Sequence, residues 1–171
     1  MNGDFLIDAK DKKIIGQRTP KWSGSITNTF NYKNWELSAN VYTREGQQIF
    51  STFVSTFMGL DGNYKNVDVD YWTVNNPTNK IPMPGNKGKY FDAYRYRNVS
   101  FARVGNVSLG YNVPKSILTK LDLSKLRISF TTTNPFTFTS YPGFDPEWGD
   151  TNTWGEATSY STFLLGINLE F

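Results

Sequence analysis

The sequence predicts an all-β protein, and more closely a segment of an antiparallel up-and-down transmembrane β-barrel. Its final nine residues alternate between large apolar side chains at Phe163, Leu165, Ile167, Leu169 and Phe171 and mostly small or polar ones. Alternation with a period of two gives a strand one apolar and one polar face. The composition is polar on average but rich in aromatics, at 16% of 171 residues. Barrel walls share this composition, because half of their strand residues face water and aromatic girdles mark both membrane interfaces.

Composition also excludes several kinds of chemistry. The chain contains no Cys and no His, which removes disulfides, thiolate nucleophiles, histidine bases and the usual zinc sites. Its net charge of +3 comes from scattered Lys and Arg, so no nucleic-acid surface is indicated. No apolar run is long enough for a membrane-spanning helix. We predict no metal, no cofactor and no enzymatic activity.

The first predicted strands form a hairpin. Residues 1–20 are polar and are expected to be an external loop that leads into the barrel strands of residues 21–171. From Trp22 to Tyr32, apolar and hydroxyl or amide residues alternate over the length that a tilted strand needs to cross a bilayer. Lys33 and Asn34 suit a tight turn, and alternation resumes at Trp35.

Residues 44–98 interrupt this rhythm and are expected to form a long external loop, in which residues 49–58 show roughly helical spacing. Strand character resumes at Phe101, which we place on one face with Val107, Leu109 and Tyr111, and Ala102 on the other. Arg103 and Gly105 are expected to interrupt the apolar face.

Pro114 suits the start of a short helix. The next strand is predicted from Leu126 to about Phe138, residues 139–157 form a second external loop, and the last strand runs from about Thr158 to Phe171. The five strands are thus joined by short, long, short and long connections. Outer-membrane barrels place short turns on the periplasmic side and long loops outside, and this order fits that rule.

At several positions the sequence resembles the SusC/RagA-type TonB-dependent outer-membrane transporters. The strongest match is the segment 100–114, SFARVGNVSLGYNVP, followed by NPFTFT at residues 134–139 and GFDPE at residues 143–147. The segments TPKWSG at 19–24, YKNWEL at 32–37, YWT at 71–73, NPTN at 76–79 and GINLEF at 166–171 add to it. The resemblance covers nearly the whole chain, although Pro135 stands where the family usually has a Leu.

The resemblance implies the C-terminal barrel portion of a plugged transporter with about 22 strands. Such proteins import glycan or peptide fragments across the bacterial outer membrane of Bacteroidetes, together with a SusD-like surface lipoprotein and energised by TonB. The N-terminal extension, TonB box, plug and most of the barrel are expected to be supplied upstream or by another polypeptide. Asp4, Asp8 and Asp11 lack the ligand spacing of a calcium loop.

Three groups of residues are candidates for function. Loop aromatics could stack on sugars, pack the loop, or touch the lipoprotein lid. Asp61, Asp68 and Asp70 are better explained as solvated carboxylates than as calcium ligands. The loop aromatics proposed to bind ligand are Tyr71, Trp72, Tyr90 and Tyr94, with Phe91 and Tyr96 nearby; the membrane-girdle candidates are Trp22, Phe30, Tyr32, Trp35, Tyr111 and Phe163.

Two rival functions stay open at this point. A soluble carbohydrate-binding β-sandwich also explains the aromatics and the strand pattern. Asp145 and Glu147 could act as a glycosidase carboxylate pair, but the resemblance marks their segment as a structural turn. The resemblance further implies that Phe171 belongs to the signal read by the barrel-insertion machinery.

Overall fold

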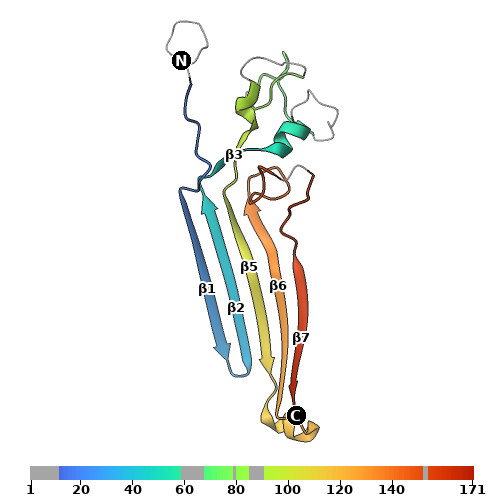
Figure 1. Ribbon diagram of the computed structural model, residues 1–171. Coiled ribbons are helices and arrows are strands. Elements are labelled where there is room, and N and C mark those ends of the chain that lie inside the picture. Colours follow the sequence, from blue (N-terminus) through green and yellow to red (C-terminus); the bar gives the residue numbers. More distant parts are fainter. Residues whose placement is uncertain (1–11, 59–67, 79, 85–90, 152–153) are drawn as a thin grey trace.

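A five-stranded antiparallel sheet dominates the computed structural model, which describes residues 12–58, 68–78, 80–84, 91–151 and 154–171 (Figure 1). The strands are neighbours in chain order, β1-β2-β5-β6-β7, as expected for an up-and-down meander. The predicted hairpin turn at residues 33–34 is confirmed. The sheet strands are β1 (Trp22–Tyr32), β2 (Trp35–Glu45), β5 (Phe101–Asn112), β6 (Lys125–Thr139) and β7 (Thr162–Glu170).

Small elements occupy the connections. In the described residues, a two-stranded sheet and two short helices lie between β2 and β5. The predicted turn of helix after Val113 is present, but it begins at Lys115, so Pro114 is its N-cap and not its first helical residue. The helical spacing of residues 49–58 is confirmed only in its second half, because Ile49 and Phe50 belong to a strand. These elements are β3 (Gln48–Phe50), η2 (Val54–Met58), η3 (Phe91–Arg95), β4 (Tyr96–Asn98), α1 (Lys115–Leu118) and η4 (Thr119–Leu121).

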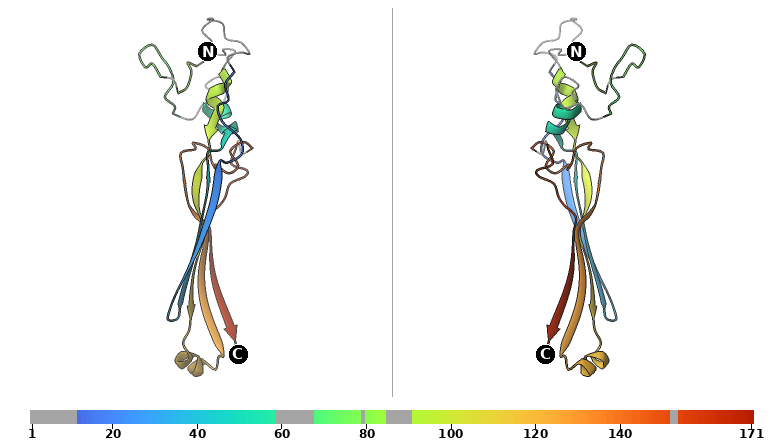
Figure 2. Two further views of the ribbon diagram at one scale, coloured as in Figure 1. Left: turned by 90° about the vertical axis from the view of Figure 1, so that its left-hand side faces the viewer. Right: turned by 90° about the vertical axis from the view of Figure 1, so that its right-hand side faces the viewer.

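The large sheet is a single layer. Seen from either side, its strands form one curved wall, and the described residues place no second sheet against it (Figure 2). Apolar side chains that a sandwich would bury are exposed along the whole wall, for example Ile26 at 66% and Ile167 at 60%. Leu37, Leu109 and Ile128 are exposed as well. This arrangement disfavours the soluble β-sandwich.

Long and short connections lie at opposite ends of the sheet, as predicted. We call one end of the sheet the loop end; there β2 and β6 end, β5 begins, and the long loops leave the sheet (Figure 1). We call the opposite end, which carries the 33–34 turn and α1, the turn end. Lys33 adopts a left-handed conformation in the tight turn. Among the described residues, no helix has the length and apolar character that crossing a membrane requires.

A β-bulge at Gly105 corrects the prediction for β5. The pairing shifts there, so Asn40 pairs with Asn106 while Val41 pairs with Val104. One extra residue reverses the alternation on its loop-end side. Phe101 and Arg103 therefore share the polar face with Asn106, whereas Ala102 and Val104 share the apolar face, opposite to the prediction. The last strand also begins later than predicted, at Thr162.

The buried residues gather at the loop end. Ile49, Val99 and Tyr141 form a small core, and Val54 and Phe101 are also buried. This core joins the two-stranded sheet of β3 and β4 to the loop between β6 and β7. The polar face of the sheet ends directly beside it, which positions the site described next.

Candidate functional site: a buried charge network at the loop end

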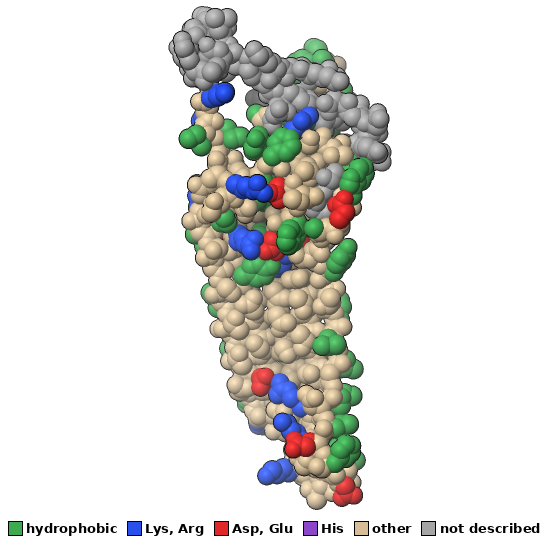
Figure 3. Space-filling view, viewed as in Figure 1, with side chains coloured by type: hydrophobic (Ala, Val, Ile, Leu, Met, Phe, Trp, Pro, Cys, Tyr) green, Lys and Arg blue, Asp and Glu red, His purple; other side chains and the backbone are tan. Residues whose placement is uncertain are grey.

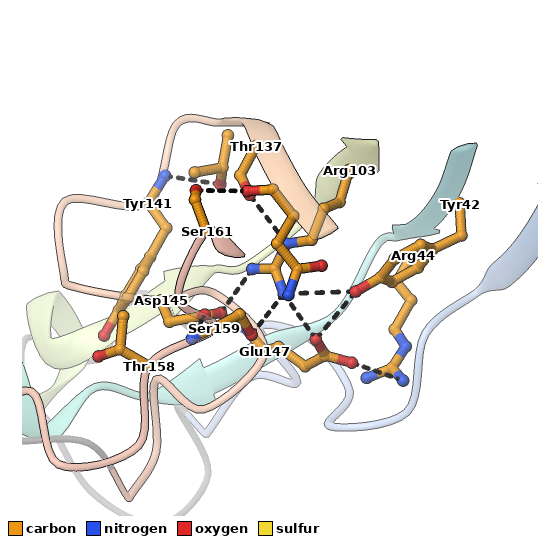
Figure 4. A network of polar contacts seen from close by, with 12 residues as sticks. Tyr42, Arg44, Arg103, Thr137, Tyr141, Asp145, Glu147, Thr158, Ser159 and Ser161 are labelled. Atoms are coloured by element: carbon orange, nitrogen blue, oxygen red, sulfur yellow. Dashed lines mark hydrogen bonds and ion pairs between the residues drawn. The ribbon is translucent and has the colours of Figure 1, made fainter. Parts of the chain in front are cut away.

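Arg103 is the centre of the site. Its side chain is only 2% exposed, although β5 is an otherwise uncharged strand. Nη2 donates to Asp145 Oδ1 at 2.8 Å, and Nη1 donates to Glu147 Oε2 at 2.9 Å. Figure 4 shows the guanidinium surrounded by these partners and by three hydroxyls. We call the following residues the Arg103 network: Tyr42, Arg44, Arg103, Thr137, Asp145, Glu147 and Ser159.

Hydroxyl groups satisfy the remaining donors of the guanidinium. Nε donates to Thr137 Oγ1 at 2.8 Å, and Nη1 donates to Ser159 Oγ at 2.7 Å. Nη1 also approaches Tyr42 Oη at 3.3 Å. Because a buried cation is stable only when paired and hydrogen-bonded, this set of partners accounts for the burial of Arg103.

Asp145 is held by the backbone as well as by Arg103. Its Oδ1 accepts from the Glu147 N–H at 2.9 Å, which closes a turn over Pro146, and its Oδ2 accepts from the Ser159 N–H at 2.8 Å. Burial opposes ionisation of this carboxyl. The hydrogen bonds from Ser159, Arg103 and Glu147 outweigh that effect and lower the pKa of Asp145 below its ordinary value.

Glu147 connects the network to β2. Its Oε1 pairs with Arg44 Nη2 at 2.9 Å, while its Oε2 accepts from Tyr42 Oη at 3.3 Å and from Arg103.

The bulge also turns the Phe101 ring inward. Its centroid lies 5.1 Å from the guanidinium carbon of Arg103 and 5.9 Å from that of Arg44, a cation–π arrangement.

This geometry suits a structural role better than catalysis. A glycosidase acid needs a carboxyl with a raised pKa and access to substrate, but Asp145 is buried, bonded to a guanidinium and shifted the other way. Glu147 is bonded to two arginines. The structure thus favours the turn interpretation of the segment 143–147.

The whole chain is similar to several known proteins of one type. The TonB-dependent receptor P3 of Formosa agariphila is 29% identical over 186 residues, covering 100% of this chain, and SusC of Bacteroides thetaiotaomicron is 28% identical over 176 residues, covering 99%. The peptide importer RagAB in its closed-closed state superposes with a TM-score of 0.75 at 26% identity, over 97% of this chain. No family model matches.

The chain resembles a portion of a SusC/RagA-type TonB-dependent transporter. It spans only 18% of the length of the Formosa receptor, 17% of SusC and 19% of the RagAB chain. The transporter resemblance therefore describes a section of a longer architecture, and it agrees with the open, single-layer sheet.

Within this transporter-like section, the described members of the predicted ligand-binding aromatics come from two different segments. Tyr71 and Trp72 lie in the 68–84 segment, which projects away from η2 and η3, whereas Tyr94 belongs to η3 (Figure 2). Tyr90 lies outside the described residues, as does the side chain of Phe91. Tyr96 packs edge-on against Phe50, with ring centroids 5.5 Å apart.

Of the predicted loop carboxylates, Asp70 lies in the projecting segment and is bonded within it. Asp70 accepts from Asn76 Nδ2 at 2.8 Å and pairs with Lys80 Nζ at 3.1 Å; these contacts lower its pKa. Its carboxylate thus braces the projecting segment. Asp61 lies outside the described residues, as do Asp4, Asp8 and Asp11. In the described part of the chain, no group of three or more His, Cys, Asp or Glu could hold a metal ion.

The girdle candidates of the transporter-like sheet all lie on its apolar face. Tyr32, Trp35 and Tyr111 are neighbours across three strands at the turn end, and the Trp35 and Tyr111 rings are 4.6 Å apart. Trp22 lies at the loop end of β1, and Phe30 lies two residues from Tyr32, near the turn end. Phe163 is in register with Thr132 and Val107, near the middle of the wall. Phe171 follows β7 at the turn end and is 91% exposed.

Sequence reasoning missed the central residue of the site. Arg103 was predicted only as an interruption of the apolar face, and its partners Tyr42, Arg44 and Ser159 were not singled out. A signal was nevertheless present. An arginine inside a strand that is followed by Gly105 marks a position where a bulge can turn the charge inward.

Proposed function

We propose that this chain is a section of the wall of a plugged β-barrel in the bacterial outer membrane, part of a transporter that imports glycan or peptide fragments. The observation that carries the proposal is the two-faced, single-layer sheet whose apolar face lies uncovered. Lipid would cover that face, and the polar face would line the lumen. TonB-dependent receptors are outer-membrane proteins, which supports this location.

The apolar face has the composition that lipid requires. In register across the wall lie Leu37, Leu109, Phe130 and Leu165, and a neighbouring row holds Trp35, Tyr111, Ile128 and Ile167. None of these side chains is charged. The aromatic rings at the turn end suit the membrane interface, because their bodies are apolar and their tips are polar.

The polar face suits a water-filled passage. Hydroxyls and amides bond across its strands: Asn40 donates to Ser25 and Thr27 at 2.9 and 2.8 Å, and Ser108 lies 3.1 Å from Thr131. Figure 3 shows this face with charged side chains gathered near its two ends and none across its middle. An uncharged polar surface allows polar cargo to pass without strong binding.

The open edges of the sheet imply neighbouring strands. In the described residues, β1 and β7 each pair on one side only, and an unpaired backbone edge is not tolerated in lipid. We infer that further strands, which bring the total to about 22, and a plug complete the barrel. A SusD-like surface lipoprotein would cover the loop end, and TonB would act through the part that is absent here.

The projecting 68–84 segment is the best candidate for contact with cargo or with the lipoprotein. Tyr71 and Trp72 are both exposed, and Trp72 N donates to Ile81 O at 3.0 Å, so the segment is ordered by its own bonds. Aromatic faces suit sugar rings and protein surfaces alike. The name of RagAB as a peptide importer supports peptides as a second class of cargo.

The experiment uses the complete gene in its native bacterium. Cells lacking the gene should fail to take up fluorescent oligosaccharides or peptides of the class that induces it, and the intact gene should restore uptake only when TonB is active. The protein should fractionate with the outer membrane, and a surface lipoprotein should copurify. A soluble protein with no dependence on TonB would refute the proposal.

A further inference from the structure

The loop between β6 and β7, residues 140–161, is attached to the polar face of the sheet by buried ionic contacts of its described part, residues 140–151 and 154–161. It supplies Asp145, Glu147 and Ser159 to the Arg103 network, whereas Arg103 and Arg44 come from β5 and β2. The loop leaves the sheet from β6 and thus reaches back over two further strands. Figure 4 shows its backbone folded around these contacts.

Release of this loop would be strongly unfavourable. If it moved away, Arg103 would lose both carboxylates and keep only the hydroxyls of Thr137 and Tyr42, which are on the sheet. Removing the partners of a buried charge is among the most destabilising changes known in proteins. The network therefore favours one position of the loop over all detached positions.

A second set of contacts fixes the same loop to the segment after β2. The Tyr141 hydroxyl lies 2.7 Å from Ser51 Oγ and donates to Gly149 O at 3.1 Å. Phe144 packs edge-on against Phe53, and Trp154 against Phe57, with ring centroids 5.3 and 5.2 Å apart.

The attachment even extends to the segment before β1. Arg18 forms an exposed ion pair with Asp150, and the Arg18 segment is itself bonded to β3, where Gln48 N donates to Gln17 O at 2.8 Å. The loop thus contacts chain segments that lead into β1 and out of β2, at the far side of the sheet from β6. The Arg103 network, the contacts with the segment after β2 and this exposed ion pair together hold the loop in place.

We propose that the 140–161 loop is a fixed section of the channel mouth that stays on the wall throughout the import cycle, and that Arg103 is its positioning residue. Opening and closing at this end would then occur in other segments. This inference rests on the proposed transport function. It predicts that a loop fastened covalently to the wall still permits uptake.

The test is a reversible cross-link in the full-length transporter. Arg44→Cys and Glu147→Cys place two thiols where side chains now touch, and this chain has no other cysteine. A short bis-methanethiosulfonate reagent should join them with no loss of uptake relative to the same variant treated with a monofunctional reagent. Loss of uptake that dithiothreitol restores would show that the loop must move, and would overturn the proposal.

A second pair covers the case in which the first variant does not assemble. Phe53→Cys with Phe144→Cys joins the loop to the segment after β2 and leaves the Arg103 network intact. The same two outcomes apply. If the untreated wild-type protein imports nothing, the proposed function fails, whatever the cross-links show.

Hydrogen–deuterium exchange tests the positioning role without any transport assay. In the purified full-length protein, amides of residues 140–161 should exchange slowly, and Arg103→Met should accelerate them on the order of a hundredfold. Arg103→Lys should restore part of the protection, because it keeps the charge. Rapid exchange of this loop in the wild-type protein would overturn the proposal independently of uptake.

Discussion

The loop end and the strands of this chain differ in where their stability comes from. The loop end has its own buried residues, such as Ile49, Val99 and Tyr141, and a charge network whose partners are all internal. The strands carry exposed apolar side chains on one face and hydroxyls on the other. The loop end thus resembles a small globular core, whereas the apolar face of the wall is uncovered and, under the proposed function, depends on lipid and on neighbouring strands.

The two regions also differ in where charged side chains lie: the loop end buries a paired arginine, whereas the apolar face of the strands has almost no charge. At the loop end a buried arginine is tolerated because protein groups replace its water. On the apolar face the described strands place no charged side chain between Trp22 and Tyr32 or between Leu126 and Phe138. The predictions below alter each region separately, and matched controls show whether the effects stay where the comparison places them.

The largest effect is expected from Arg103→Ala. The change leaves Asp145 and Glu147 buried without their cation, which should cost about 3–5 kcal/mol in the stability of the loop end. Hydrogen–deuterium exchange of the full-length protein should show the loss in residues 140–161. The control Ser108→Ala, on the same strand and face, should change that loop little. An equal acceleration of amide exchange in the β1–β2 hairpin would contradict the separation of the two regions.

A charge in the wall should have the next largest effect. Val107→Arg puts a cation on the apolar face near the middle of β5, where lipid contact should cost about 2–4 kcal/mol. Ser108→Arg, one residue further and on the polar face, is the control and should be nearly neutral. The measurement is the urea dependence of unfolding in lipid vesicles. Similar losses for both variants would argue against lipid as the cover of that face.

Gly105→Ala should disturb the bulge that connects the two regions. A Cβ there would lie 2.9 Å from Asn40 Oδ1 and 3.2 Å from the Tyr42 ring. Tyr42 is held by the Arg103 network, so we expect a loss of about 1–3 kcal/mol. In Gly24→Ala the new Cβ would meet nothing nearer than 3.5 Å, and thermal unfolding of this variant should match the wild type.

Tyr141→Phe should weaken only the loop end, by about 1 kcal/mol, because it removes the hydrogen bonds with Ser51 and Gly149 but keeps the ring. Limited proteolysis between residues 140 and 161 should become faster while the strands stay resistant. Tyr160→Phe, an exposed position on the same loop, serves as the control. No change in Tyr141→Phe would mean that the ring alone holds the contact.

The smallest effect is expected from mild acid. The pKa of Asp145 is lowered in the folded protein. The ionised carboxylate therefore stabilises the folded loop fully above the ordinary aspartate pKa, and this stabilisation is lost as the pH falls through the pKa of Asp145 in the folded protein. Since the ordinary value is about 3.9, the loop should keep its protection from exchange between pH 7 and pH 5. A loop that loosens near pH 5 would indicate that the carboxylate is less well paired than the structure shows.

Local patterns were enough to predict the wall. The hairpin of β1 and β2, the five sheet strands and the order of short and long connections all follow from alternation and turn residues. The bulge was missed, since Gly105 adds one residue without breaking the apolar rhythm of Val107 and Leu109, and the arginine before it was the one local signal. As a result Phe101 and Ala102 were placed on the wrong faces.

The site depends on contacts between distant residues, which explains why it was missed. Arg103 is 42 residues from Asp145 and 61 from Tyr42, so no local pattern connects them. The resemblance marked the Asp145–Glu147 segment as structural but gave no reason for it. The reason is the buried guanidinium, which only the folded sheet brings into place.

Arg127 at the turn end affects the register in which β5 pairs with its two neighbouring strands. It extends from β6 across β5 to Glu36 on β2, with Nη2 donating to Oε1 at 2.9 Å, and it passes over Gly110, where any side chain would occupy the same space. A slip of β5 by two positions would put Ser108 or Asn112 beneath the guanidinium and break this ion pair. The contact therefore favours the native register of β5 between β2 and β6, because the ion pair closes over the strand only where Gly110 lies beneath the guanidinium.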